Sequence, residues 1–304
     1  MKRILFFIFL SITLITGQQV SAQIKYTLIP ESPRPGDPVT IGVNTPVREA
    51  LLFVNEKQIG KAKCFNVHIE GSPRVFTAAI ITIPSTVTAN NAVIRLMNES
   101  LVCEIPVNIT ARDFHSETLQ LTPALVSLVS ESSPEKTAEA EKLWQILTTS
   151  GITVYHTGTF VSPTASTRRT SRFGTRRVNQ YHDGRRTTSI HAGIDFGTPT
   201  GSEVRSCGRG RVVLARPRIV SGNSVIIEHA PGVYSIYYHL DSISVKEDTI
   251  VETGDLIGLS GSTGFSTGPH LHWELRVSTE NTDPDEFVNR PLIDKELIIS
   301  RILN

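Results

Sequence analysis

The sequence predicts a mainly β protein, with an N-terminal and a C-terminal β domain joined by a short helical segment. Short apolar runs separated by turn signals fill residues 24–112 and recur after Ser189. Between these two regions, one stretch repeats its apolar residues at helical spacing. The length of 304 residues suits about two domains. Because no repeated helix pattern alternates with the second set of strands, we expect an antiparallel sheet there.

The first residues predict export. The basic pair Lys2 and Arg3 precedes an apolar run over 4–15, and residues 20–22 fit the small-residue cleavage pattern of a secretory signal. The run is shorter than the ~18 residues of a membrane span, so an uncleaved anchor is the less favoured alternative. We predict that residues 1–22 are a signal peptide, that no stable membrane span remains after its removal, and that the protein works in the periplasm or cell envelope.

Charge and cysteine content say little about the partners of the protein or about its disulfides. The formal net charge of +1 argues neither for nor against a nucleic-acid partner, although an exported protein is not expected to have one. Cys64 and Cys103 lie in the first domain and could pair in an oxidising compartment. Cys207 has apolar neighbours and is expected to be a buried thiol.

Residues 24–112 predict an immunoglobulin-like β-sandwich. The strands are expected at 39–43, 50–54, 75–83 and 92–96. The domain shows no cluster of reactive side chains. A spacer, or a module that holds a substrate or partner, is therefore its expected role.

Residues 113–160 predict a helical connector. Ser133 fits an N-cap and Pro134 the first helical position. Apolar residues then recur at helical spacing: Ala140, Leu143, Trp144 and Leu147. We expect this stripe to pack against a neighbouring domain, and Gly151 to cap the helix end.

The second domain, residues 161–304, opens with a basic segment. Its arginines are Arg168, Arg169, Arg172, Arg176, Arg177, Arg185 and Arg186. The simplest interpretation is a solvated loop, and the alternative is the edge of a cleft that receives an acidic polymer. Strands are then predicted at 211–215, 224–229 and 233–239, and a short helix around 292–303.

Histidines gather where the predicted strands of this domain end. His270 and His272 are two residues apart, so on a strand they share one face. His191 with Asp195, and His239, add further imidazoles and a carboxylate at two other places. This combination is typical of a zinc site.

A catalytic zinc takes three protein ligands and leaves one position for water. We assign His191, Asp195 and His272 as the ligands, and His239 and His270 as the imidazoles that transfer protons or stabilise the oxyanion. The other two histidines of the domain are less favoured. His182 lacks a partner at ligand spacing, and His229 precedes a proline turn and is expected at the surface.

These motifs resemble the lysostaphin-type (LytM-like) zinc endopeptidases, which cut peptidoglycan peptides. The matching segments are His191-x3-Asp195, Tyr238-His239-Leu240, Gly261-x-Thr263-Gly264, His270-Leu271-His272 and Arg172-Phe173-Gly174-x-Arg176. The resemblance covers roughly residues 160–285. It implies an antiparallel β domain with a groove, zinc on His191, Asp195 and His272, and catalytic His239 and His270. Family members often use a tyrosine near the first histidine, for which Tyr181 is the nearest candidate.

We therefore expect an exported zinc metallo-endopeptidase that hydrolyses peptide cross-links of bacterial peptidoglycan with metal-activated water. Its partners would be stem or cross-bridge peptides. One alternative is a non-catalytic module that binds and activates another cell-wall hydrolase, which the complete set of ligands disfavours. The other is a zinc peptidase that acts on exported proteins, which the sequence leaves open.

Overall fold

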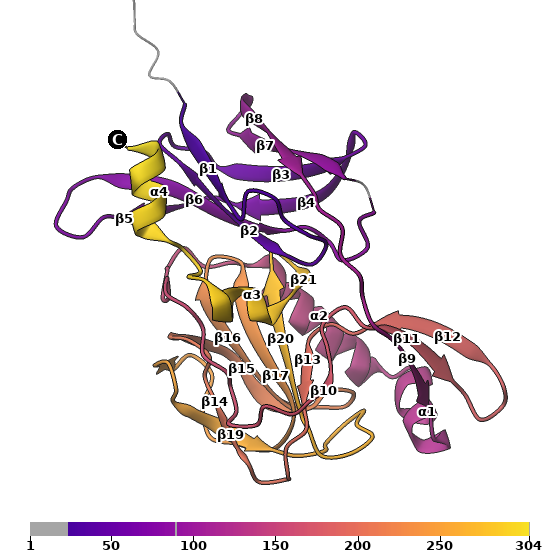
Figure 1. Ribbon diagram of the computed structural model, residues 1–304. Coiled ribbons are helices and arrows are strands. Elements are labelled where there is room, and N and C mark those ends of the chain that lie inside the picture. The colour runs from indigo at the N-terminus through magenta and orange to yellow at the C-terminus, as the bar shows by residue number, and fades with distance from the viewer. Residues whose placement is uncertain (1–23, 89, 304) are drawn as a thin grey trace, which may run out of the picture.

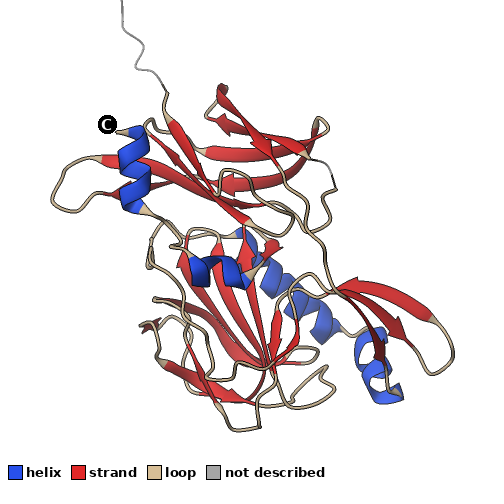
Figure 2. Cartoon of the chain, viewed as in Figure 1, coloured by secondary structure: helices blue, strands red, loops and turns tan. Residues whose placement is uncertain are grey.

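The computed structural model describes residues 24–88 and 90–303, so the predicted signal peptide lies outside the described residues. Figure 1 shows an N-terminal β domain packed on a larger β domain, with a small sheet and two helices at one side. Strands are the main element throughout (Figure 2), which confirms the predicted mainly β class. Within the described residues, no helix has both the length and the apolar character needed to cross a membrane.

The N-terminal domain consists of two four-stranded antiparallel sheets. One has the order β1 (Tyr26–Ile29), β2 (Pro38–Val43), β6 (Val75–Thr82), β5 (Phe65–His68), and the other β4 (Lys57–Lys63), β3 (Glu49–Val54), β7 (Asn91–Met97), β8 (Leu101–Asn108). Aliphatic side chains from both sheets, such as Ile41 and Ile94, form the core between them. Four of these strands match predicted ones, whereas β4 is too rich in lysine to show an apolar run.

The connector begins with a strand that the sequence did not indicate. β9 (Ser116–Gln120) pairs in parallel with β11 (Arg176–Gln180), which pairs antiparallel with β12 (Arg186–Ile190). The helices α1 (Pro123–Ser130) and α2 (Pro134–Thr148) follow β9. Much of the basic segment is therefore a hairpin within a three-stranded sheet, rather than a loop.

Helix α2 begins as predicted but packs only in part. The Ser133 hydroxyl accepts a hydrogen bond from the backbone N–H of Lys136, as an N-cap does. Leu147 is buried and Leu143 packs beside it on the C-terminal domain. Trp144 is 61% exposed, so the stripe expected to be buried is interrupted there.

The prediction that Gly151 caps α2 is wrong. Thr149 occupies the cap position, and its backbone N–H donates to the Gln145 carbonyl. The Gly151 N–H instead donates to Glu228 Oε1 at 2.8 Å. The glycine thus ties the chain to the C-terminal sheet after the helix has ended.

The C-terminal domain is built on one large antiparallel sheet. Its main path is β10 (Arg169–Ser171), β13 (Ile194–Phe196), β20 (Leu271–Val277), β17 (Val233–Ile243), β16 (Gly222–Ala230), β15 (Gly210–Arg218), β18 (Ile250–Val251). Three further strands join it: β14 (Glu203–Arg205), β19 (Leu256–Ser260) and β21 (Glu280–Thr282). The pairings among these strands are antiparallel, as predicted.

Alternation along β20 decides which side chains can reach a site. Leu271, Trp273 and Leu275 are fully buried in the core. Since side chains alternate along a strand, His272 and Glu274 face the other way. Burying an apolar side chain of this size stabilises the fold by roughly 1.5–3 kcal/mol, so this register is strongly favoured.

The two β domains share an interface that the C-terminal helices complete. α3 (Pro284–Asn289) and α4 (Lys295–Ile302) follow β21, and α4 lies against β1 and β2 (Figure 1). Ile298 of α4 packs directly on Gly42, which leaves no room for a Cβ there. Arg112 bridges Asp37 of the N-terminal domain and Asp283 of the C-terminal domain.

The cysteines are free thiols. Cys64 and Cys103 are half-buried in the N-terminal domain. Cys207 is fully buried, as predicted, and that burial raises its pKa to about 12.

Candidate metal centre and active site

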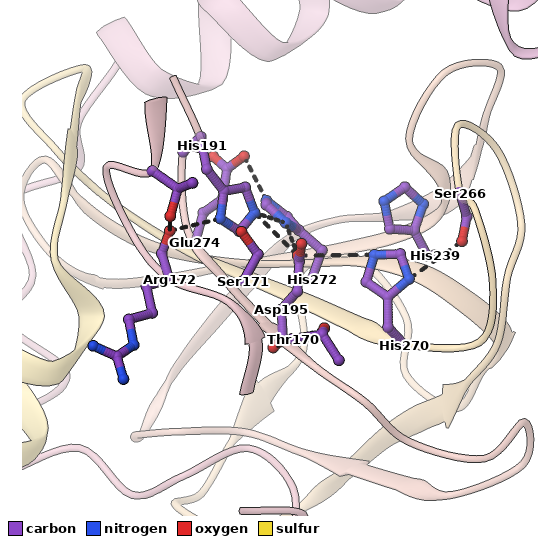
Figure 3. Close-up of polar contacts among 12 residues, drawn as sticks. Thr170, Ser171, Arg172, His191, Asp195, His239, Ser266, His270, His272 and Glu274 are labelled. Atoms are coloured by element: carbon purple, nitrogen blue, oxygen red, sulfur yellow. Dashed lines mark hydrogen bonds and ion pairs between the residues drawn. The ribbon is translucent and has the colours of Figure 1, made fainter. Parts of the chain in front are cut away.

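The three residues predicted as zinc ligands lie together. β13 pairs with β20 so that Asp195 is directly opposite His272, and His191 precedes β13. His191 Nε2 is 3.1 Å from both Asp195 Oδ1 and His272 Nδ1, and His272 Nδ1 is 2.7 Å from Asp195 Oδ1. All three side chains are buried and point toward one another (Figure 3).

Hydrogen bonds fix which nitrogen of each imidazole faces this cluster. His191 Nδ1 is 2.9 Å from the Arg172 carbonyl, which can only accept, so Nδ1 carries the proton. His272 Nε2 is 3.0 Å from Glu274 Oε1, and it donates to that carboxylate. In the neutral imidazoles, the nitrogens that face Asp195 therefore carry the lone pairs, which is the form that metal-binding histidines adopt.

Three electron-pair donors thus converge on one point, and they would repel one another without a cation. Two imidazoles and a carboxylate are the donors that zinc takes. Zinc–ligand distances of 2.0–2.1 Å in a tetrahedron require donor atoms about 3.3 Å apart. The observed separations of 2.7–3.1 Å need only a small widening. The residues present therefore fit a zinc ion.

The electrostatics of the cluster favour positive charge. Burial acts to lower the pKa of His272, but hydrogen bonds to Asp195 and Glu274 outweigh it and raise the pKa to about 9. Burial acts to raise the pKa of Asp195, but when a proton is shared with His191 or His272 the hydrogen bonding and positive charge of these imidazoles hold that pKa well below its usual range. A proton or a metal ion is accordingly stabilised between these groups.

His239 and His270 lie beside the cluster without joining it. Their rings are 4.8 Å apart, and His270 Nε2 is 3.8 Å from Asp195 Oδ1. Each Nδ1 is 2.8 Å from a backbone carbonyl, of Thr263 for His239 and of Gly268 for His270. Both Nδ1 atoms therefore donate, and both Nε2 atoms are left to accept a proton. Burial, with the neighbouring His272 and His270, lowers the pKa of His239 to about 3.

A backbone irregularity turns His239 toward the cluster. Tyr237 is opposite Trp273 in the core, and Tyr238 is opposite His272 on the other face. Strict alternation would return His239 to the core face. Instead, the φ of His239 is +61°, in the left-handed region, and the pairing of β17 with β16 shifts at this point. Left-handed backbone at a non-glycine residue is uncommon and costs free energy, and such outliers cluster at functional sites.

A groove of about 510 Å³ opens over the cluster. Its apolar lining comes from separate parts of the chain: Leu119, Ile190, Val220, Phe265 and Pro269. The imidazoles of His239, His270 and His272 also line it. An extended chain could therefore lie across the cluster with apolar contacts on several sides.

Two other residues considered from the sequence, Tyr181 and His229, do not line the groove. Tyr181 is in the turn between β11 and β12, where its hydroxyl is 3.4 Å from Thr187 Oγ1, and it does not line the groove. The prediction that His229 is a surface residue is wrong. It is fully buried, with Nε2 2.7 Å from Ser235 Oγ, because β16 is covered on both faces up to its end.

Two charged partners of the ligands, Glu274 and Arg177, were not predicted from the sequence. Glu274 is two residues after His272 and shares its face, so strand alternation could have indicated it. Arg177 donates from Nη2 to Asp195 Oδ2 at 3.0 Å. Nothing in the sequence separates Arg177 from the neighbouring arginines, of which Arg169 pairs with Asp285 and Arg185 with Asp183.

Comparison with known proteins agrees with this geometry. Residues 189–284 match peptidase family M23. The chain is 40% identical over 124 residues to the DD-carboxypeptidase/endopeptidase Mpg of Neisseria meningitidis, a match that covers 41% of this chain and 28% of that protein. It is 44% identical over 93 residues to the peptidoglycan DD-endopeptidase ShyB of Vibrio cholerae, covering 31% of this chain and 22% of that protein. The chain thus spans less than a third of the length of these curated relatives.

The fold recurs in a solved structure. A Pseudomonas aeruginosa crystal structure named for peptidase M23 matches with a TM-score of 0.60, over 84% of this chain and 94% of that chain. The sequences are 20% identical, so this likeness concerns the fold alone. The segment matched to peptidase family M23 carries His191, Asp195 and His272, so the chain contains a domain of this family of metallopeptidases.

Proposed function

We propose that this protein is an exported zinc metallo-endopeptidase that hydrolyses peptide cross-links of bacterial peptidoglycan. The observation that carries the proposal is the convergence of His191 Nε2, Asp195 Oδ1 and His272 Nδ1 in the groove, with two further imidazoles beside them. Relatives named as endopeptidases, one of them for peptidoglycan, support the substrate class. Because that polymer lies outside the cytoplasm, the substrate and the predicted signal peptide agree.

The residues of the groove would have two separate roles, metal binding and proton transfer. His191, Asp195 and His272 would hold the metal. A zinc ion there would polarise the scissile carbonyl and lower the pKa of water to about 7. His239 and His270 each present an unprotonated Nε2, which can accept the proton of the attacking water and return it to the leaving amine. Their fixed Nδ1–H bonds keep both rings oriented during this transfer.

The groove suits a peptide rather than a compact small molecule. Its apolar residues come from β9, β12, the turn between β15 and β16, and the loop before β20, so four separate segments surround it. Such a lining can contact several successive residues of a substrate and hold one peptide bond over the cluster. This positioning would raise the rate, because it brings the bond and the catalytic groups together before reaction.

The decisive experiment is incubation of the zinc-loaded protein with purified peptidoglycan sacculi, followed by mass analysis of the released fragments. We expect fragments whose peptide cross-links are cut, and none from a His272→Ala variant. Sacculi left intact by zinc-loaded protein would refute the proposal. Cleavage of an exported protein instead would favour the general peptidase, and stimulation of another wall hydrolase without cleavage would favour the activator.

A further inference from the structure

Glu117 lies on β9, far from the matched M23 segment in sequence, yet one side chain separates it from the metal centre. The parallel register of β9 with β11 places Glu117 directly opposite Arg177. Glu117 Oε1 accepts from Arg177 Nε at 2.6 Å, and Arg177 Nη2 donates to Asp195 Oδ2 at 3.0 Å. A strand that precedes both connector helices therefore reaches a predicted ligand through one guanidinium.

The two oxygens of Asp195 have different partners. Oδ1 is within 3.1 Å of His191 Nε2 and His272 Nδ1, so it faces the metal position. Oδ2 accepts from Arg177. A carboxylate held at one oxygen cannot rotate freely about its last bond, so Arg177 fixes which oxygen points inward.

Arg177 is itself held from the other side. Its planar guanidinium donates to the carboxylates of Glu117 and Asp195 at the same time, which the ammonium group of a lysine cannot reproduce. The side chains of Arg177 and Glu117 are only 18% and 28% exposed, so solvent screens this pair incompletely. Ser171 Oγ donates to the same Glu117 oxygen at 3.1 Å and helps to keep it in place.

The charges alternate from the connector to the metal position. Glu117 is negative, Arg177 positive and Asp195 negative, and the metal would carry two positive charges. A partly buried guanidinium this close to a divalent cation repels it unless a second carboxylate balances the guanidinium. Glu117 is placed to provide that balance.

We propose that Arg177 and Glu117 are positioning residues for the metal centre. Arg177 orients Asp195, and Glu117 neutralises Arg177, so that zinc affinity depends on a strand outside the matched M23 segment. Leu119, also on β9, lines the same groove, so this strand contributes to both the metal centre and the substrate surface. The inference rests on the proposed zinc centre and extends it to the connector.

The test is the zinc dissociation constant of the full chain, measured by competition with a chromophoric chelator and without substrate. We expect Glu117→Gln and Arg177→Lys each to weaken zinc binding by about 10- to 100-fold, the usual effect of changing a residue that supports a metal ligand. Arg169→Gln is the matched control, because it breaks an ion pair of the same segment, with Asp285, that does not touch the ligands. The zinc affinity of Arg169→Gln should equal that of the wild type.

A double variant separates charge balance from simple support of the fold. If Glu117 acts by balancing the Arg177 guanidinium, Glu117→Gln should weaken zinc binding in the wild-type background but have little further effect in an Arg177→Gln background. An equal fold-change in both backgrounds would overturn the charge-balance argument.

Wild-type affinity in folded Glu117→Gln and Arg177→Lys would overturn the whole inference. If thermal melting shows that Glu117→Gln does not fold, Arg177→Lys decides the question alone. A protein that binds zinc through this network but leaves sacculi uncut would refute the proposed function and leave this inference standing.

Discussion

His270 and His272 are two residues apart on one face of the sheet, but only His272 reaches Asp195. His272 Nδ1 is 2.7 Å from Asp195 Oδ1, whereas His270 Nε2 is 3.8 Å away. The Leu271 side chain between them is fully buried on the opposite face. Two identical side chains therefore have different surroundings, and we expect them to have different roles.

Replacing each of these two histidines separately should distinguish zinc binding from proton transfer. His272→Ala removes a ligand and should lose zinc and activity together. His270→Ala should keep about one zinc per chain and lose ~100- to 10,000-fold in turnover, the usual contribution of a positioned acid–base group. Zinc content and turnover should be measured on the same preparations. Loss of metal from His270→Ala, with metal retained in His272→Ala, would reverse the assignment.

His239 offers a substitution that preserves its unusual backbone. Asparagine adopts the left-handed region more readily than most residues, so His239→Asn should fold and bind zinc like the wild type. Turnover should fall by ~100- to 10,000-fold, because the Nε2 lone pair is gone. His239→Val, a β-branched residue unsuited to this φ, should in addition lower the melting temperature. Unchanged turnover in His239→Asn would exclude His239 from catalysis.

Helix α2 contains a matched pair for testing which of its apolar residues support the fold. Leu147 is 5% exposed and Trp144 is 61% exposed, one turn apart. Leu147→Ala should lower the free energy of unfolding by about 2–5 kcal/mol, as for a buried leucine. Trp144→Ala should change it by less than about 0.5 kcal/mol. Chemical denaturation of both variants checks this, and equal effects would mean that Trp144 is covered in solution.

Buried His229 should make the fold sensitive to mild acid. Burial lowers its pKa to about 3, with a smaller contribution from His156, whereas an unfolded histidine titrates near 6.5. Below pH 6.5 the unfolded chain therefore binds a proton that the folded chain excludes, and stability falls with pH. From pH 7.5 to 5.5 the wild type should lose about 1.4 kcal/mol more than His229→Gln.

The remaining titrating groups are common to both proteins, so their effects cancel in this comparison. Unfolding free energies at the two pH values give the difference directly. An identical loss in both proteins would mean that His229 is protonated in the folded state. The Cys207 thiol near His229 remains neutral over this range, because burial raises its pKa to about 12.

The sequence predicted the parts of the site that local periodicity controls. His270 and His272 share a face because a strand repeats every two residues, and Leu271 anchors that register in the core. The antiparallel sheet followed from the absence of alternating helices. The N-cap of α2 followed from Ser133, whose hydroxyl needs only the next turn of the chain.

What the sequence did not predict depends on contacts between distant segments. Arg177 looks like its neighbours until β13 brings Asp195 to it, and Glu117 gains significance only from the parallel pairing of β9 with β11. The position of His239 depends on a single left-handed residue, which no periodic pattern reveals. His229 lies near the end of β16, which is covered on both faces up to that end, although a proline turn usually indicates the surface.

The packing of α4 on the N-terminal domain has a consequence for the order of folding. Ile298 covers Gly42 of β2, and Arg301 Nη1 donates to Thr27 Oγ1 of β1 at 3.0 Å. The ribosome makes β1 and β2 long before it makes α4. The surface of β1 and β2 that α4 covers therefore stays exposed until the whole peptidase domain has been synthesised. Because the last helix to be synthesised completes the packing of the first domain, final folding of that domain depends on synthesis of the second.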